Sequence, residues 1–147
     1  MNSAVLEPAI LLPMFGVMVL TFVVWVILYV KRIRHMVKER IDPRKLGTPD
    51  KRLLLDERVN WPAYNFQNLF ELPVLFYFVC LYIYVAQLAD IAYLAAAWLF
   101  FVLRVVHSAV QITVNIVRLR FAVYMAGALC LWFIVLRAAF DAWSRYL

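Results

Sequence analysis

The stretch AILLPMFGVMVLTFVVWVILYV, residues 9–30, contains no charged residue. At a rise of about 1.5 Å per residue, a helix of this length crosses the roughly 30 Å hydrocarbon core of a bilayer, so we predict a membrane span. Pro13 and Gly16 lie near its start, where membrane helices tolerate them. The run is longer than the core of a signal peptide, so we expect the mature protein to keep it.

The composition of the whole chain agrees with a membrane protein. Hydrophobic residues make up 67% of the 147 residues, and the mean hydropathy is +0.82, whereas soluble domains contain roughly 45–50% apolar residues. Three more apolar runs follow the first, at residues 62–88, 91–117 and 121–140. Short links near Asp90 and Arg118 make the last three runs antiparallel neighbours. We therefore predict an all-α integral membrane protein, one domain over residues 1–147, folded as an antiparallel bundle of four transmembrane helices.

The positive charge of the chain is concentrated in one segment. The net charge is +6, and ten of the fifteen Lys and Arg residues lie within residues 31–58, directly after the first run. This position follows the positive-inside rule, so we predict a cytoplasmic loop over residues 31–60 and no nucleic-acid partner. The link at residues 118–120 is basic as well and should lie on the same side. The termini of this multi-pass protein are then expected on the opposite side, of the inner membrane if the source is bacterial.

The two cysteines, Cys80 and Cys130, both lie inside apolar runs. A thiol in such a place usually behaves as a small hydrophobic group. Their separation has neither the pattern of a disulfide framework nor that of metal ligands, so we expect no metal site.

Polar residues interrupt the third run, and each lies three or four positions from at least one other. They are Arg104, His107, Ser108, Gln111, Asn115 and Arg118. At about 100° per residue they form one stripe on a helix. Asn68 and Glu71 share a face of the second run in the same way. Buried polar groups also hold membrane helices together, but so many in line exceed that need, and we predict a partly hydrated cavity open to the basic side.

Two ion pairs are predicted from depth and spacing. Glu71 and Arg104 lie at comparable depths in their spans, and either charge alone in the membrane would be costly, so we expect them to pair. Arg137 and Asp141 are spaced i, i+4 at the other end of the fourth run and should pair with each other.

The run NFQNLFELP at residues 65–73, followed by RVVH at 104–107 and then by Arg120 and Tyr124, resembles the MAPEG family, the membrane-associated proteins in eicosanoid and glutathione metabolism. The resemblance extends over nearly the whole chain. It implies a homotrimer of four-helix protomers in the lipid bilayer, with glutathione as co-substrate bound near the cytoplasmic face.

The resemblance also implies site residues. Arg120 matches the arginine that stabilises the glutathione thiolate, with Arg118 as an alternative alignment, and Tyr124 matches a tyrosine beside it. The remaining positions implied to bind glutathione are Asn68, Glu71, Arg104, His107 and Gln111. A thiol is an efficient nucleophile only as thiolate, which a nearby arginine favours, and the acceptor would be a lipophilic electrophile or peroxide.

Some residues depart from the eicosanoid-forming members of the family. Gln111 stands where those members have Tyr, Tyr64 and Gln67 stand where they have Arg, and Phe121 replaces a Ser. These differences argue against prostaglandin or leukotriene synthesis. The sequence favours a glutathione-dependent transferase or peroxidase. A lipid-binding or scaffold protein without catalysis is the alternative, and an ion or proton pathway ranks last, because no second acid for a relay and no inverted repeat is found.

Overall fold

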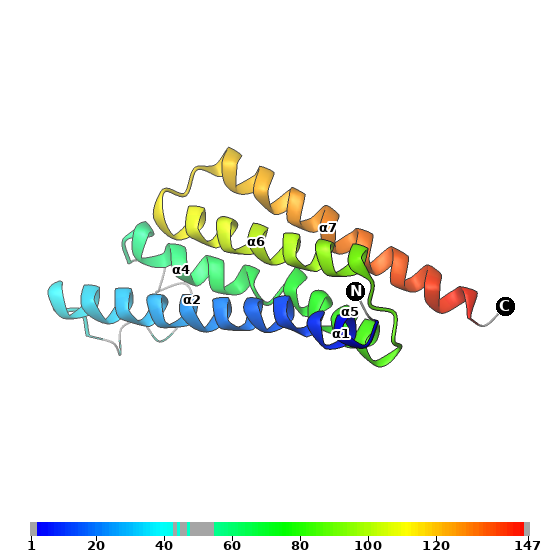
Figure 1. Cartoon of the computed structure of the whole chain (residues 1–147). Helices are drawn as coiled ribbons and strands as arrows, with labels where there is room; N and C mark the ends of the chain where they lie inside the picture. The colour runs from blue at the N-terminus through cyan, green and yellow to red at the C-terminus, as the bar shows by residue number, and fades with distance from the viewer. Residues whose placement is uncertain (1–2, 43, 45–46, 48–54, 146–147) are drawn as a thin grey trace.

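The computed structural model describes residues 3–42, 44, 47 and 55–145, and no strand occurs in this part of the chain. The described residues form six helices, in the order α1 (Ser3–Ala9), α2 (Leu11–Lys38), α4 (Glu57–Asn68), α5 (Leu72–Val85), α6 (Ile91–Thr113) and α7 (Val117–Ser144). Successive long helices run in opposite directions, and both ends of the described chain lie at the same end of the bundle (Figure 1).

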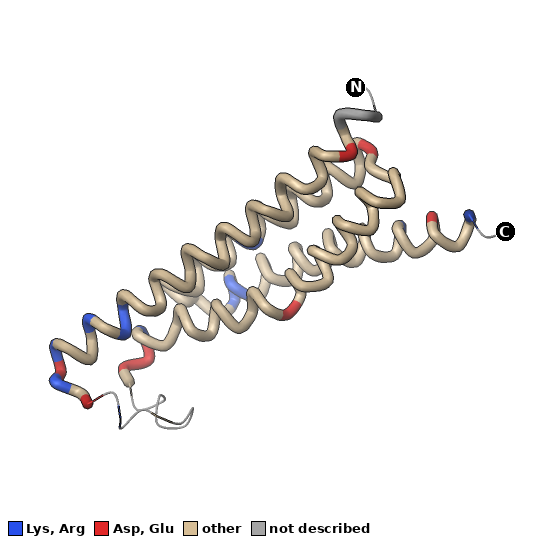
Figure 2. Tube along the Cα trace, turned by 90° about the horizontal axis from the view of Figure 1, so that it is seen from below, with Lys and Arg blue, Asp and Glu red and all other residues tan. Residues whose placement is uncertain are grey.

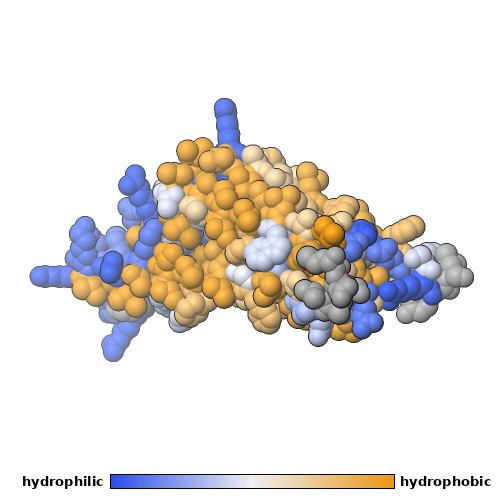
Figure 3. Space-filling view, viewed as in Figure 1, coloured by the Kyte–Doolittle hydropathy of each residue, from blue (hydrophilic) through white to orange (hydrophobic). Residues whose placement is uncertain are grey.

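Within the part of the chain that the structure describes, four stretches are long and apolar enough to cross a membrane. They are Leu6–Lys38, Glu57–Val85, Ile91–Thr113 and Val117–Ser144. Most charged residues lie toward the ends of the bundle (Figure 2), and the face turned to the viewer in Figure 3 is mostly apolar between two hydrophilic ends. The predicted all-α bundle of four membrane spans is therefore confirmed.

The first membrane helix extends further than predicted. Helix α2 continues through the basic residues 31–34 and ends only at Lys38, because Lys and Arg are good helix formers. They end the hydrophobic span and leave the helix intact. The Lys31 Nζ donates to the carbonyl oxygen of Ile112, 3.2 Å away, at the carboxyl end of α6. The segment predicted as a loop at 31–60 is correspondingly shorter, since α4 already begins at Glu57.

The second span is broken, whereas we predicted one continuous helix over residues 62–88. Helix α4 ends at Asn68 and α5 begins at Leu72. Pro73 is the second residue of α5. Proline has no N–H to donate and its ring clashes with the carbonyl four residues earlier, so an uninterrupted helix is disfavoured at this point. The break brings Glu71 to the junction between the two helices.

Apolar side chains from all the spans fill the half of the bundle around the α5–α6 turn. Phe76 and Phe100 are both fully buried there, with ring centroids 4.3 Å apart. Helices α2 and α6 approach closely at Gly16, where a Cβ atom would lie only 2.8 Å from the ring of Phe101. This packed region supports the more polar half of the bundle, where α6 ends and α7 begins.

A network of polar side chains ties the turn before α6 to α7. Arg137 contacts both carboxylate oxygens of Asp90, and its guanidinium lies 4.1 Å from the ring centroid of Tyr93. The Tyr93 hydroxyl donates to Asp141 at 2.6 Å. The predicted Arg137–Asp141 ion pair is therefore wrong, because Asp90 offers Arg137 a two-point contact and Asp141 is taken by Tyr93.

We expect this network to make the fold sensitive to acid. The hydrogen bond from Arg137 holds the pKa of the Asp90 carboxyl below its usual range. A lowered pKa means that the stabilisation is complete at neutral pH and is lost as the pH falls through that lowered value. The contribution should be about 1 kcal/mol, because the pair is partly exposed.

The measurement is the thermal stability of the detergent-solubilised protein between neutral and acid pH. Asp90→Asn is the matched variant, because its amide oxygen can still accept from the Tyr93 N–H that Asp90 accepts at 2.8 Å. It should be less stable than wild type at neutral pH, and the two curves should converge in acid. Curves that stay parallel would contradict the role of the Asp90 charge.

Candidate functional site

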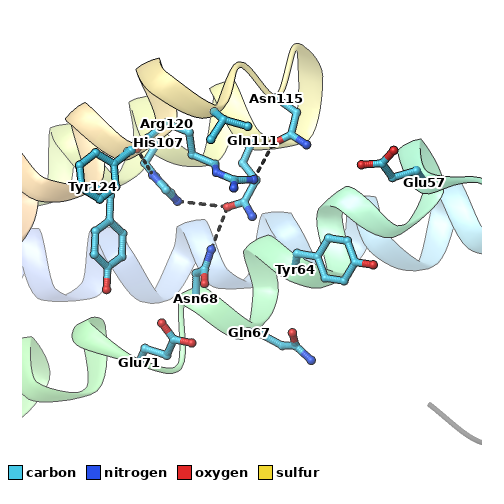
Figure 4. Close-up of a pocket in the computed structure, with 12 residues that line it drawn as sticks. Glu57, Tyr64, Gln67, Asn68, Glu71, His107, Gln111, Asn115, Arg120 and Tyr124 are labelled. Atoms are coloured by element: carbon cyan, nitrogen blue, oxygen red, sulfur yellow. Dashed lines mark hydrogen bonds between the residues drawn. The ribbon is translucent and has the colours of Figure 1, made fainter. Parts of the chain in front are cut away.

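A pocket of about 630 Å³ lies between α4, α6 and the start of α7 (Figure 4). It is in the half of the bundle where α2 ends in its basic residues (Figure 1). The side chains that line it are those of Glu57, Tyr64, Gln67, Asn68, Glu71, His107, Gln111, Asn115, Val117, Arg120, Phe121 and Tyr124. Most are polar, although the pocket lies between helices that are apolar elsewhere.

Helical spacing places these side chains together. On α4, Glu57, Tyr64 and Asn68 recur at intervals of seven and four, which keeps them on one face. Glu71 joins them from the turn after α4. On α6 and just beyond it, the lining residues recur every four positions, at 107, 111 and 115. The predicted polar stripe therefore faces a pocket over part of its length.

Gln111 is the centre of the hydrogen bonding beneath the pocket. Its Oε1 accepts from Asn65 Nδ2 at 2.9 Å and from Asn68 Nδ2 at 3.0 Å, and it lies 3.1 Å from His107 Nε2. The Gln111 side chain is only 2% exposed. One carbonyl oxygen on α6 thus fixes two amides of α4 and an imidazole of its own helix.

His107 extends this network to α7. Its Nδ1 lies 3.2 Å from the main-chain carbonyl oxygen of Arg120, while its Nε2 faces Gln111. The His107 ring also packs beside Tyr124, with ring centroids 5.6 Å apart. The start of α7, where Arg120 and Tyr124 lie one turn apart, is in this way fixed relative to α6.

Arg120 presents its positive charge to the pocket. Its Nη1 donates to Asn115 Oδ1 at 2.7 Å. The ion pairs within the described part of the chain join Lys38 to Glu39 and Arg137 to Asp90, so neither pocket carboxylate pairs with Arg120. The guanidinium is held in place by a neutral group and keeps its charge available for an anion.

Arg104 lies behind the pocket and does not line it. Its guanidinium is 4.9 Å from the ring centroid of Tyr124 and 5.0 Å from that of Phe100, and the residue is 1% exposed. Neither Nη1 nor Nη2 of Arg104 has a hydrogen-bond acceptor among the described residues. Gly127 lies beside it, where a Cβ atom would be in ordinary van der Waals contact with the guanidinium at 3.9 Å. Aromatic faces, through cation–π contact, surround this buried cation.

The predicted ion pair between Glu71 and Arg104 is therefore wrong. The described residues contain no such pair within 4 Å, and Glu71 is exposed at the pocket. Its charge acts on Arg104 only through space. The reason is the helix break, which carries Glu71 out of the helical position from which the pairing was inferred.

The structure brings most of the predicted site residues together. Those that line the pocket are Asn68, Glu71, His107, Gln111, Arg120 and Tyr124. Arg104 lies behind Tyr124, and Arg118 is exposed outside the pocket. Of the two arginines, Arg120 lines the pocket and Arg118 does not.

Several lining residues were not predicted as site residues. Asn115 belonged to the stripe, and Tyr64, Gln67 and Phe121 were noted only as departures from a family pattern. Glu57 and Val117 were missed altogether, because we expected their helices to begin later. Extending the second span to Glu57 would have placed it two turns from Tyr64, on the same face. The described residues contain no group of three or more His, Cys, Asp and Glu side chains suited to a metal ion.

The comparison with protein families agrees with the resemblance seen in the sequence. The model of the MAPEG family matches residues 10–140, which include every residue lining the pocket. No curated protein and no solved structure matches the chain. Because the family match covers most of the chain, and the structure is a four-helix membrane bundle, the protein belongs to the MAPEG family, the membrane-associated proteins in eicosanoid and glutathione metabolism.

Proposed function

We propose that the protein is a glutathione-dependent transferase or peroxidase that acts on lipophilic electrophiles in the membrane. The observation that carries the proposal is the unpaired guanidinium of Arg120 in a polar pocket of about 630 Å³. That volume is within the range of small-molecule sites. An arginine without a carboxylate partner favours the anionic form of a thiol placed beside it.

The chemistry uses the sulfur of bound glutathione. Arg120 stabilises the thiolate, whose sulfur attacks the electrophilic carbon of the acceptor and forms a C–S bond as the leaving group departs with the bonding electrons. With a hydroperoxide, the thiolate sulfur attacks the terminal oxygen and the O–O bond breaks, which gives the sulfenic acid of glutathione and an alkoxide that takes up a proton to become the alcohol. A second glutathione thiol then gives the disulfide and water. Tyr124 lines the same pocket, and in this proposal its hydroxyl donates a hydrogen bond to the sulfur or to the leaving oxygen.

An apolar groove supports a lipophilic acceptor. It has a volume of about 420 Å³, lies between α5 and α7, and is lined by side chains that include Leu75, Phe78 and Trp132. Leu75 is one helical turn beyond Glu71, which lines the polar pocket. A hydrophobic molecule in this groove would lie along α7, the helix that also contributes Arg120 and Tyr124 to the polar pocket.

The orientation and the assembly belong to the same proposal. We infer that the basic end of α2 and the α6–α7 link face the cytoplasm, because Lys and Arg favour that side. We also infer a homotrimer, as the family relationship implies. Light scattering of the protein in detergent tests the trimer, and accessibility of a cysteine introduced at exposed Arg44 tests the orientation.

Glutathione binding to the detergent-purified protein tests the proposed function. Calorimetry should show saturable binding of glutathione, and the protein should conjugate it to a chlorinated nitrobenzene. The matched ligand is S-methylglutathione, which retains the peptide but cannot form a thiolate, so it should bind and give no conjugate. An absence of both binding and conjugation would refute the proposal.

A non-catalytic lipid-binding protein is the second candidate. The observation in its favour is the groove between α5 and α7, whose lining is almost wholly apolar. Stoichiometric lipid that co-purifies with the protein, together with an absence of thiol chemistry, would favour this function over the first.

A further inference from the structure

Asn115, in the link between α6 and α7, is held by hydrogen bonds of both its main chain and its side chain. Helix α6 ends at Thr113, and Asn115 adopts the left-handed conformation, with a φ of 47°. The Asn115 N–H donates to the carbonyl oxygen of Val110 at 2.8 Å, which closes the end of the helix. Asparagine is among the few residues with a side chain that adopt this conformation readily. The main chain of Asn115 therefore has a clear role as a helix terminus.

The side chain of Asn115 has a separate role. Its Oδ1 accepts from Arg120 Nη1 at 2.7 Å, and both residues line the polar pocket. The other end of Arg120 is held as well, because its main-chain carbonyl oxygen lies 3.2 Å from His107 Nδ1. With the main chain fixed by His107, the direction of the guanidinium depends on Asn115.

The acceptor for Arg120 is a neutral amide, although two carboxylates line the same pocket. Glu57 and Glu71 lie near its ends in Figure 4, and neither forms an ion pair with Arg120. A carboxylate in the place of the Asn115 amide would bind the guanidinium more strongly and would cancel its charge. A neutral acceptor fixes the geometry of the guanidinium and leaves its charge intact.

We propose that Asn115 is a positioning residue, which aims Arg120 into the pocket while leaving the guanidinium charge free for the anionic sulfur of a thiol. This inference rests on the proposed function, since it assigns Asn115 to the thiolate site. It separates two roles of one residue, closing α6 with its main chain and directing Arg120 with its side chain.

Asn115→Asp and Asn115→Gly distinguish these roles. Both residues are compatible with the left-handed conformation. Aspartate keeps an acceptor oxygen beside Arg120 and adds a negative charge, whereas glycine removes the acceptor. The readout is the pKa of the thiol of bound glutathione, measured from the ultraviolet absorbance of the thiolate over a pH series and compared with the pH profile of conjugation.

Asn115→Asp should raise the pKa of the bound thiol by about one unit or more, because the new carboxylate neutralises the nearby guanidinium. Conjugation at a pH below that pKa should fall roughly tenfold, in proportion to the lost thiolate. The thermal stability should be unchanged or higher, because the new ion pair forms at a site that is already ordered. Asn115→Gly should raise the pKa less and lower kcat, because Arg120 keeps its charge and loses its direction.

Thr113→Asp is the charge control, because it adds a carboxylate to an exposed position of the same turn that does not line the pocket. It should change the pKa of the bound thiol little. If Asn115→Asp leaves the thiol pKa and the pH profile as in wild type, Asn115 only closes the helix and the inference is wrong. It is also wrong if Thr113→Asp has an equal effect. If the wild type binds no glutathione, the proposed function fails, and this inference fails with it.

Discussion

Arg120→Ala is expected to lower kcat/KM for glutathione conjugation by roughly 100-fold or more, because it removes the positive charge that stabilises the thiolate and the developing transition state. Arg120 is half-buried, and its side chain donates to a single neutral acceptor, Asn115. Little of the fold depends on this contact, so the stability should change by no more than about 1 kcal/mol. The measurement is the rate of conjugation at saturating and limiting glutathione, together with thermal unfolding in the same detergent.

Arg118→Ala is the matched variant, two residues earlier on the same helix. Arg118 is exposed and lies outside the pocket, so its replacement should leave kcat/KM within about a factor of two of wild type. Arg120→Lys adds a further comparison, since lysine retains the charge but lacks the planar fork that contacts Asn115. Loss of activity in Arg118→Ala, with activity retained in Arg120→Ala, would show that the thiolate-stabilising arginine is Arg118.

Gln111→Leu is expected to destabilise the protein by about 2 to 4 kcal/mol and to remove most of its activity. The substitution deletes the oxygen that accepts from Asn65 and Asn68 and faces His107, and leaves these groups without that partner. Asn65 is fully buried and cannot turn to water. Because Asn68 and His107 also line the pocket, the loss of their orientation should reduce activity as well.

Gln111→Glu is the control for this prediction, because a carboxylate still offers oxygens to the two amides and the imidazole. It should unfold at a temperature closer to wild type than Gln111→Leu does. Equal stability of wild type and Gln111→Leu would mean that the network adds nothing to the packing of α4 against α6. If both variants are destabilised equally, the shape of the side chain matters and its hydrogen bonds do not.

The predicted and observed sites differ mainly in the ion pairs that we predicted from the sequence. The spacing on α6 correctly placed His107 and Gln111 on the inner face, because helical periodicity depends on one segment alone. The predicted ion pair between Glu71 and Arg104 involved two segments and could not be inferred in the same way. The prediction required Glu71 to continue the helix of Asn68, and that helix ends between these two residues.

A contact between two segments also explains why the predicted Arg137–Asp141 ion pair, at the other end of the bundle, was wrong. Arg137 and Asp141 have a spacing that favours a pair within α7, yet Arg137 binds Asp90, which lies in the turn before α6. A contact between neighbours on a helix surface contributes only about 0.2–0.5 kcal/mol. A two-point contact from another segment outweighs it, and only the folded chain brings Asp90 within reach.

The sequence by itself determined that this chain crosses the membrane four times, that its polar residues occupy inner faces of the second and third spans, and that it belongs with the MAPEG proteins. These properties follow from hydropathy and periodicity within each segment and from the order of short motifs along the chain, none of which requires knowing how the helices pack. The tertiary structure decided where the second span breaks, that Arg120 and not Arg118 faces the pocket, and that Asn115 accepts a hydrogen bond from Arg120. Those outcomes depend on the depth and rotation of one helix against another, since a hydrogen bond forms only when two groups from different segments come within about 3 Å.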